Sequence, residues 1–234
     1  MEFDRKKHNF ILANIIGDIY KNPKINRYLG FKGGTAALMF YNLPRGSVDL
    51  DFDLLNESKK EEVFNEIPLI LKDYGEILDK SEKRHTLFFL LSYQKGAKKV
   101  KVEISKRPAV SEYEVKSYLG IPVIVMRKES MVSNKLCALL TRKKFAARDL
   151  FDMWFFLKEG WQFDEKVISD KLNLSVSNAL KDAISKVEKV TKNQLLHGLA
   201  EFIDEKDKNW IREKLKVELL FQLKLSKETC SKLT

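Results

Sequence analysis

Residues 31–52 read FKGGTAALMFYNLPRGSVDLDF, which places a glycine pair, a short helical pattern and an acidic strand pattern in immediate succession. Thr35 is a suitable capping residue for a helix that begins after Gly34 and ends before Pro44. From Ser47 onward apolar and polar residues alternate strictly, which predicts a strand with aspartates on one face. The sequence therefore predicts a glycine turn that lies beside an acidic strand.

Asp49 and Asp51 are the candidate metal ligands on that strand. Residues i and i+2 of a strand project to one face roughly 6.5–7 Å apart, so the two carboxylates can share one or two hard cations such as Mg²⁺. A bare D-x-D pattern more often marks a solvated strand face. Here Gly33 and Gly34 let a phosphate approach the backbone, and the Ser47 hydroxyl can donate to a phosphate oxygen.

Glu103 is the candidate third carboxylate that a two-metal site would need. Apolar and polar residues alternate over 100–104, so a strand there places Glu103 away from the apolar face. The alternative is an exposed glutamate that balances Lys101.

The first 125 residues predict an α/β or α+β domain, because helical and strand patterns alternate and all five prolines fall there. Helices are expected over 10–19 and 58–73, and strands over 87–93 and 100–104. Beyond residue 126 there is no proline, and helical periodicity predicts a C-terminal helical domain over 126–234. Its expected helices span 130–142, 146–158, 164–172, 176–189, 192–203 and 207–225.

Composition limits the function classes. With 44% apolar residues among 234, the chain can fill a core, which argues against intrinsic disorder. The net charge of +10 and a pI near 9.4 favour polyanionic partners such as RNA, DNA or nucleotides. Cys137 and Cys230 lie too far apart in sequence to suggest a zinc site or a disulfide framework. We see no signal peptide or membrane span and expect a cytoplasmic protein.

Residues 31–52 closely resemble the first motif of the AbiEii/AbiGii-type nucleotidyltransferases, which are toxins of toxin–antitoxin systems in the DNA polymerase β-like superfamily. The segments KLCALLTR over 135–142 and RDLFD over 148–152 resemble the K-L-x-A-L-x-x-R and R-D-L-x-D segments of that family. The resemblance covers roughly residues 28–160.

The resemblance implies a nucleotidyltransferase-type mixed β-sheet with helices, formed by a catalytic domain over 1–125 and followed by the helical domain. It implies a Mg²⁺-dependent enzyme, with two ions, that transfers a nucleoside monophosphate from an NTP to a hydroxyl and releases pyrophosphate. We expect an RNA acceptor, most simply a tRNA end, and an antitoxin protein as a possible partner. The residues assigned by the resemblance are Asp49, Asp51 and Glu103 for metal, Gly33, Gly34, Thr35, Ser47 and Lys135 for the nucleotide, and Asp49, Asp51, Lys135 and Asp149 for activity.

Two alternatives stay open: a catalytically idle RNA- or protein-binding module of the same fold, and a small-molecule nucleotidyltransferase of the antibiotic-modifying type. The later motif also has an ordinary interpretation, in which Lys135 is a surface lysine and Arg148 forms a surface ion pair with Asp152. We interpret the aromatic run 154–156 as helix core rather than a base-stacking platform, and Cys137 as a packing residue.

Overall fold

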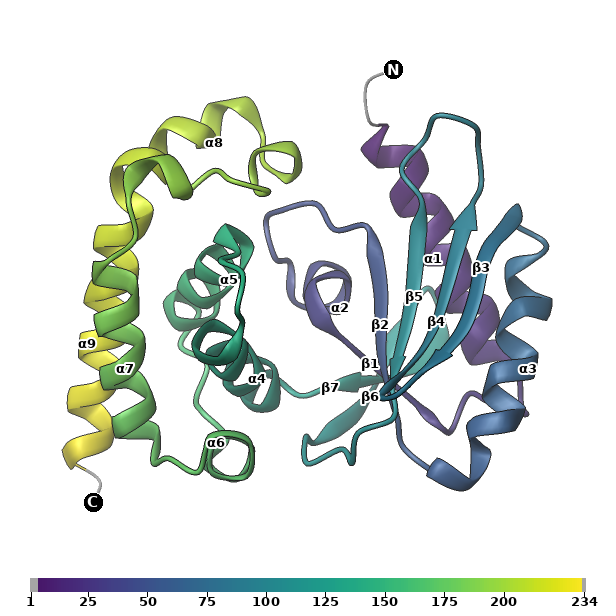
Figure 1. The fold of residues 1–234 in the computed structure, drawn as a ribbon, viewed down its shortest axis with the longest axis horizontal. Helices are drawn as coiled ribbons and strands as arrows, with labels where there is room; N and C mark the ends of the chain where they lie inside the picture. Colours follow the sequence, from purple (N-terminus) through teal and green to yellow (C-terminus); the bar gives the residue numbers. More distant parts are fainter. Residues whose placement is uncertain (1–3, 233–234) are drawn as a thin grey trace. The chain divides into compact units, whose positions relative to one another are not determined.

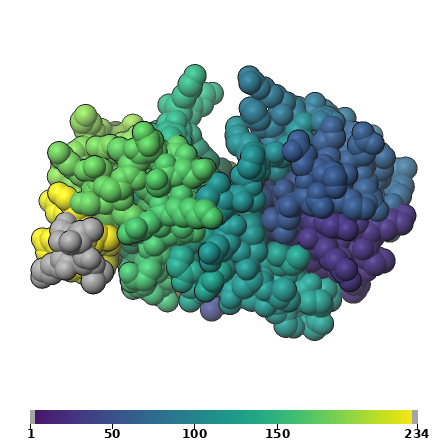
Figure 2. Space-filling model, turned by 90° about the horizontal axis from the view of Figure 1, so that it is seen from below, coloured from purple at the N-terminus to yellow at the C-terminus, as the bar shows by residue number. Residues whose placement is uncertain are grey.

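The computed structural model describes residues 4–232, which fall into two compact units (Figure 1). The sheet unit takes the chain up to Asn42 and then Gly46–Met126, and the helical unit takes Leu43–Arg45 and the chain from Arg127 onward. Figure 2 gives the same residue colouring with side chains drawn as spheres. Within residues 4–232, no helix is both long enough and apolar enough to cross a membrane.

The sheet unit contains a seven-stranded mixed sheet in the order β3-β4-β5-β2-β1-β7-β6. The pairs β2/β5 and β1/β7 are parallel, and the other neighbouring pairs are antiparallel. The strands are β1 (Leu29–Lys32), β2 (Asp49–Leu54), β3 (Glu76–Lys83), β4 (Thr86–Ser92), β5 (Val100–Ser105), β6 (Tyr113–Tyr118) and β7 (Ile121–Met126). This mixed sheet with helices confirms the predicted fold class.

Strand register gives the sheet one apolar face and one polar face. Phe31 pairs with Phe52, which pairs with Ile104, and all three side chains are fully buried. The helices of this unit are α1 (Arg5–Lys21), α2 (Gly33–Tyr41), η1 (Glu57–Lys59) and α3 (Lys60–Leu71). Phe64 of α3 contacts Phe89 of the apolar face with ring centroids 5.5 Å apart. The opposite face is therefore the one that can carry polar chemistry.

The helical unit is built around α5, in which ten residues are buried. Its helices are α4 (Lys128–Thr141), α5 (Ala147–Lys158), α6 (Glu165–Leu172), α7 (Val176–Glu188), η2 (Lys192–Gln194), η3 (Ala200–Phe202), α8 (Glu205–Trp210), the π-helical turn η4 (Ile211–Leu215) and α9 (Lys216–Lys232). Trp154, Phe155 and Phe156 are buried, so the interpretation of this run as core is confirmed.

Two local predictions were wrong. Residues 192–203 form two short 3₁₀ helices instead of one helix, with Gly198 between them at a φ of +66° that a continuing helix does not use. Residues 207–225 are helical throughout, as predicted, with the π-helical turn η4 between α8 and α9. Thr35 is not a cap, because α2 begins at Gly33 and Lys32 occupies the N-cap.

Gly30 on β1 gives the first testable prediction. A Cβ at this position would lie 2.3 Å from Cε1 of the Tyr113 ring, which crosses the polar face there. Gly30→Ala should therefore lower the unfolding free energy by about 1–3 kcal/mol, the usual cost of overpacking.

The measurement is urea unfolding followed by far-ultraviolet circular dichroism in a double-mutant cycle with Tyr113→Ala. We expect Tyr113→Ala to relieve much of the cost of Gly30→Ala, so that the two changes are strongly non-additive. Additive effects would show that the ring is not the obstacle.

Candidate functional site

The polar face of the sheet brings the predicted carboxylates to adjacent strands. Asp51 of β2 is the register partner of Glu103 on the parallel strand β5, and Asp49 is the partner of Lys101. Register partners project to the same face, so Asp49, Asp51 and Glu103 share it. The side chains of all three are partly exposed, and solvent can reach them.

The two carboxylate oxygens of Asp49 have different surroundings. Its Oδ1 is buried and finds no hydrogen-bond partner among residues 4–232, whereas its Oδ2 lies 3.5 Å from the Lys101 ammonium. Buried carboxylate oxygens are almost always satisfied, and a hard cation is one group that satisfies them. The donor set at Asp49 thus fits a divalent metal. Within residues 4–232 no group of three or more His, Cys, Asp or Glu side chains is arranged to hold an ion, so the role of Glu103 as third ligand stays a prediction.

The glycine turn lies directly against the acidic strand. Gly33 has a φ of +80°, and a Cβ built there would lie 2.5 Å from Asp51 Oδ2. A side chain at this position would be both strained and in collision with the carboxylate. Helix α2 begins here with no side-chain cap and no acidic residue in its first turn, as far as the described residues go. Such an N-terminus is suited to phosphate, which keeps Gly33 and Gly34 as predicted nucleotide-binding residues.

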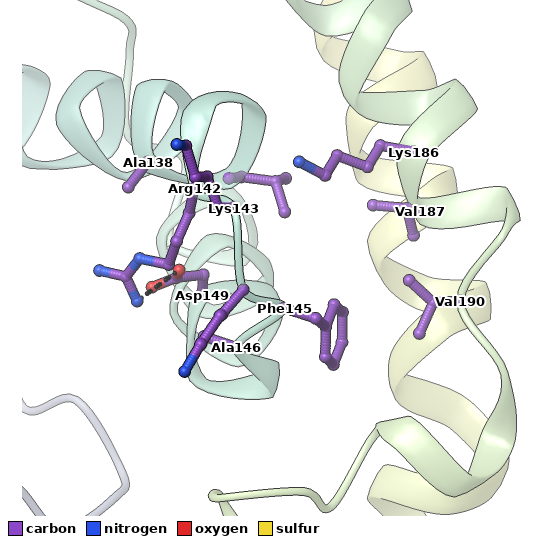
Figure 3. Close-up of a pocket in the computed structure, with 11 residues that line it drawn as sticks. Ala138, Arg142, Lys143, Phe145, Ala146, Asp149, Lys186, Val187 and Val190 are labelled. Carbon is purple, nitrogen blue, oxygen red and sulfur yellow. Dashed lines mark ion pairs between the residues drawn. The ribbon is translucent and has the colours of Figure 1, made fainter.

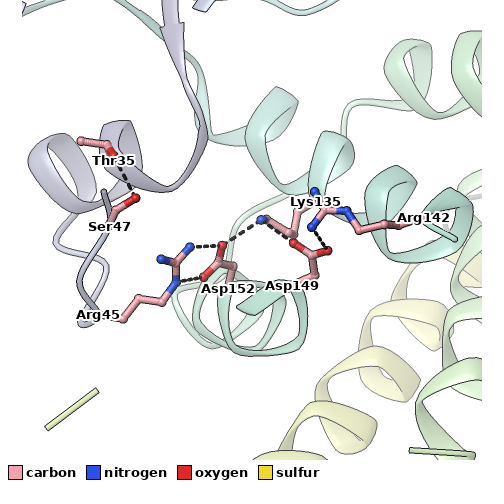
Figure 4. Close-up of polar contacts among 7 residues, drawn as sticks. All are labelled: Thr35, Arg45, Ser47, Lys135, Arg142, Asp149 and Asp152. Carbon is pink, nitrogen blue, oxygen red and sulfur yellow. Dashed lines mark hydrogen bonds and ion pairs between the residues drawn. The ribbon is translucent and has the colours of Figure 1, made fainter. Parts of the chain in front are cut away.

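Thr35 and Ser47 are both buried and tie α2 to the start of β2. The Thr35 hydroxyl lies 2.8 Å from Ser47 Oγ (Figure 4). It also lies within hydrogen-bond distance of the Asp49 carbonyl. These contacts hold Asp49 in place beside the glycine turn. A direct contact of either hydroxyl with the nucleotide stays a prediction.

Asp53, the third aspartate of β2, is occupied by other partners. It lies 2.5 Å from the Lys32 ammonium and accepts a hydrogen bond from the Tyr113 hydroxyl. Burial and the neighbouring Asp53 charge raise the pKa of Tyr113, so its hydroxyl keeps the proton that it donates. Asp53 is therefore a structural carboxylate, in contrast to Asp49.

The helical unit carries a chain of ion pairs that is buried at Asp152 and exposed at Arg142 (Figure 4). Asp152, fully buried on α5, receives two hydrogen bonds from the Arg45 guanidinium at 2.5 and 2.7 Å. Lys135 of α4 lies 2.8 Å from Asp152 and 3.0 Å from Asp149. Arg142 continues the chain at 3.0 Å from Asp149. Lys135 and Asp149, predicted from the later motif, are thus brought together.

Within this chain of ion pairs, the opposite charges outweigh burial in setting the pKa values of Asp152 and Lys135. Burial alone would raise the pKa of Asp152, but the charges of Arg45 and Lys135 outweigh it and lower the pKa to about 2. For Lys135, burial alone would lower the pKa, whereas Asp152 and Asp149 raise it above its ordinary value. Asp152 and Lys135 are therefore both ionised at neutral pH.

Sequence reasoning missed Arg45 and mistook the partner of Asp152. Asp152 pairs with Arg45 and Lys135 rather than in a surface pair with Arg148, whose guanidinium lies over the Phe202 ring at 5.7 Å. The signal was available: an aspartate inside the apolar run of α5 must be buried, and a buried carboxylate needs cationic partners.

Asp152→Asn should lower the unfolding free energy at pH 7 by about 3–5 kcal/mol, because it leaves the buried cations without their partner. All three tryptophans lie in the helical unit, so tryptophan fluorescence during urea unfolding measures the stability of that unit. The exposed Asp170→Asn on α6 is the matched control and should change stability by less than about 0.5 kcal/mol.

The folded pKa of Asp152 lies below its ordinary value of 3.8, so its stabilisation is complete above about pH 4 and is lost as the pH falls toward 2. The gap between wild type and Asp152→Asn should therefore narrow over that range. This account of the Asp152 ion pairs would be contradicted if Asp152→Asn lowered the unfolding free energy by less than about 1 kcal/mol at pH 7. It would also be contradicted if the difference in unfolding free energy between wild type and variant did not depend on pH.

Comparison with solved structures places the fold. JHP933 from Helicobacter pylori superposes with a TM-score of 0.65 at 21% identity, over 98% of this chain and 94% of that chain. A proposed nucleotidyltransferase from H. pylori gives 0.64 at 22% identity, over 98% of this chain and 97% of that chain. A search of curated proteins gives no significant match. The fold is therefore that of nucleotidyltransferase structures.

The family model described as "Nucleotidyl transferase AbiEii toxin, Type IV TA system" matches residues 20–222. The chain belongs to this AbiEii nucleotidyltransferase toxin family. The match includes the glycine turn, the acidic strand and the Lys135–Asp149 pair, and it extends beyond the motifs into α9.

Proposed function

We propose that this chain is a Mg²⁺-dependent nucleotidyltransferase that transfers a nucleoside monophosphate from an NTP to a hydroxyl of RNA and releases pyrophosphate. The observation that carries the proposal is the buried Oδ1 of Asp49 beside the glycine turn, for which the described part of the chain offers no hydrogen-bond partner. Membership of the family supports the transferase chemistry.

Asp49 and Asp51 would hold the metal, and Glu103 would be the third ligand. The acceptor oxygen forms a bond to the α-phosphorus while the bond from that phosphorus to pyrophosphate breaks, and the hydroxyl proton leaves to solvent. Bound Mg²⁺ supplies charge that assists deprotonation of the acceptor and departure of pyrophosphate. Gly33 and Gly34 would offer backbone N–H groups to the triphosphate, with Thr35 and Ser47 fixing the turn.

Lys135 and Asp149 would act from the helical unit. Lys135 keeps its proton because two carboxylates raise its pKa, and its side chain is 17% exposed. A protonated lysine of this kind suits a phosphate, and Asp149 would hold it in position.

The positive net charge of the protein supports RNA as the acceptor. A net charge of +10 coexists with an acidic strand face, so lysines and arginines elsewhere must attract a polyanion. The segments 98–101 and 142–148 are rich in them. We take a tRNA end as the acceptor and a toxin role, with an antitoxin partner, as the biological setting; the family description supports the toxin role.

Asp49→Ala and Asp51→Ala should each reduce nucleotide transfer at least about 100-fold, because each would remove a ligand of the cation that stabilises charge at the reacting phosphorus. Their melting temperatures should stay equal to wild type or rise, since the two carboxylates repel one another without metal. The exposed Asp79→Asn on β3 is the matched control and should keep full activity. Full activity in the Asp49 and Asp51 variants would refute the metal site.

The acceptor is tested with each NTP labelled at the α-phosphate, Mg²⁺, and total tRNA, total protein or an aminoglycoside panel in parallel. We expect label in RNA, with a yield that falls as salt rises, because a polyanion must be attracted. Label only in protein or in an aminoglycoside, or transfer to RNA that is indifferent to salt, would overturn the RNA assignment.

Mg²⁺ with NTP should raise the melting temperature by several degrees, since a ligand that binds only the folded state stabilises it. Glu103→Gln should reduce this shift and the turnover together. If neither changes, the third carboxylate lies elsewhere.

A further inference from the structure

A pocket of about 130 Å³ lies in the helical unit, where the end of α4 and the start of α5 face α7 (Figure 3). The side chains that matter for its chemistry are Arg142, Lys143, Lys144, Phe145, Lys186 and Val190. Phe145 points toward Val190 across the pocket. The pocket is thus basic on one side and apolar on the other.

The positive charge of the pocket is only partly neutralised. Among the described residues, Asp149 is the one carboxylate that lines the pocket, and it already pairs with Lys135 and Arg142. Lys143 and Lys144 are exposed, and within residues 4–232 neither has a carboxylate at ion-pair distance. Two neighbouring ammonium groups without partners attract an anion.

The apolar side has room for one planar ring. A cavity of about 150 Å³ holds a benzene molecule in another protein, so a space of this size accepts a single six-membered ring. Phe145, Val187 and Val190 provide the apolar surface, and an aromatic ring there can stack on a base. A nucleotide combines a flat base with an anionic phosphate, so it matches both the apolar side and the basic side of the pocket.

We propose that this pocket binds one nucleotide of the single-stranded acceptor RNA, with its base against Phe145 and its flanking phosphates on Lys143 and Lys144. This inference rests on the proposed transfer to RNA. The NTP itself is the poorer occupant, because a metal-bound triphosphate needs free carboxylates and Asp149 is already paired with two cations. The Arg142–Asp149 pair forms one wall, so the bound strand lies next to Lys135.

The test measures binding of a fluorescein-labelled single-stranded oligouridylate of ten nucleotides by fluorescence anisotropy over a range of salt. The variant Lys143→Glu with Lys144→Glu should weaken binding at least about tenfold. It should also lower the slope of log affinity against log salt by about 1.4, since each phosphate contact on a single strand contributes about 0.7. Phe145→Leu should weaken binding about tenfold with the slope unchanged, because it removes a stack and no charge.

Lys206→Glu with Lys214→Glu is the matched control, because it makes the same charge change at exposed lysines elsewhere in the helical unit. Its affinity should stay within about threefold of wild type. If the control lost as much affinity for the oligouridylate as the variant at Lys143 and Lys144, the proposed RNA site in this pocket would be wrong, whatever the transfer assay gives. Oligouridylate binding that depends on Lys143, Lys144 and Phe145 in a protein that transfers no label would support the pocket and refute the proposed function.

Discussion

The close approach of Gly33 to the Asp51 carboxylate is the constraint on which the candidate site depends. A Cβ at Gly33 would lie 2.5 Å from Asp51 Oδ2, so the chain can pass from β1 into α2 beside β2 only without a side chain there. The N-terminus of α2 attracts anions, and the neighbouring carboxylates attract cations. A metal-bound triphosphate presents both charges, which is why one turn and one strand can serve a nucleotidyltransferase.

Burial separates the carboxylates that hold the structure together from those that solvent can reach. Asp53 and Asp152 are buried, and each has a cation within 2.5 Å of a carboxylate oxygen. Losing one partner of such a pair is costly, because the charge that remains has no water to solvate it. Asp49 and Asp51 are partly exposed, and one oxygen of Asp49 has no hydrogen-bond partner within the described residues. The same residue type on one strand thus has two roles, set by its surroundings.

Much of the fold could be predicted because its signals are local. The acidic strand, α1, α3 and most helices beyond residue 126 follow from periodicity that each segment carries within itself. β1 has only four residues and β3 is mostly charged, so neither shows a clear pattern. The in-register pairing of Asp51 with Glu103 could be expected only as a shared face, since register depends on pairing between distant strands. Arg45 was missed because its partner is 107 residues away, and Asp152 was interpreted as part of a surface ion pair although apolar residues follow it in α5.

Binding of Mn²⁺ tests the central claim most directly, because Mn²⁺ substitutes for Mg²⁺ and is located in a crystal by its anomalous scattering. Crystals would be grown with Mn²⁺ and a non-hydrolysable NTP analogue, for the wild type and for Asp51→Ala. We predict an anomalous peak in contact with the carboxylates of Asp49 and Asp51 in the wild type, and a weakened or absent peak in the variant. A peak bound elsewhere, or one that Asp51→Ala leaves unchanged, would contradict a catalytic metal site on β2.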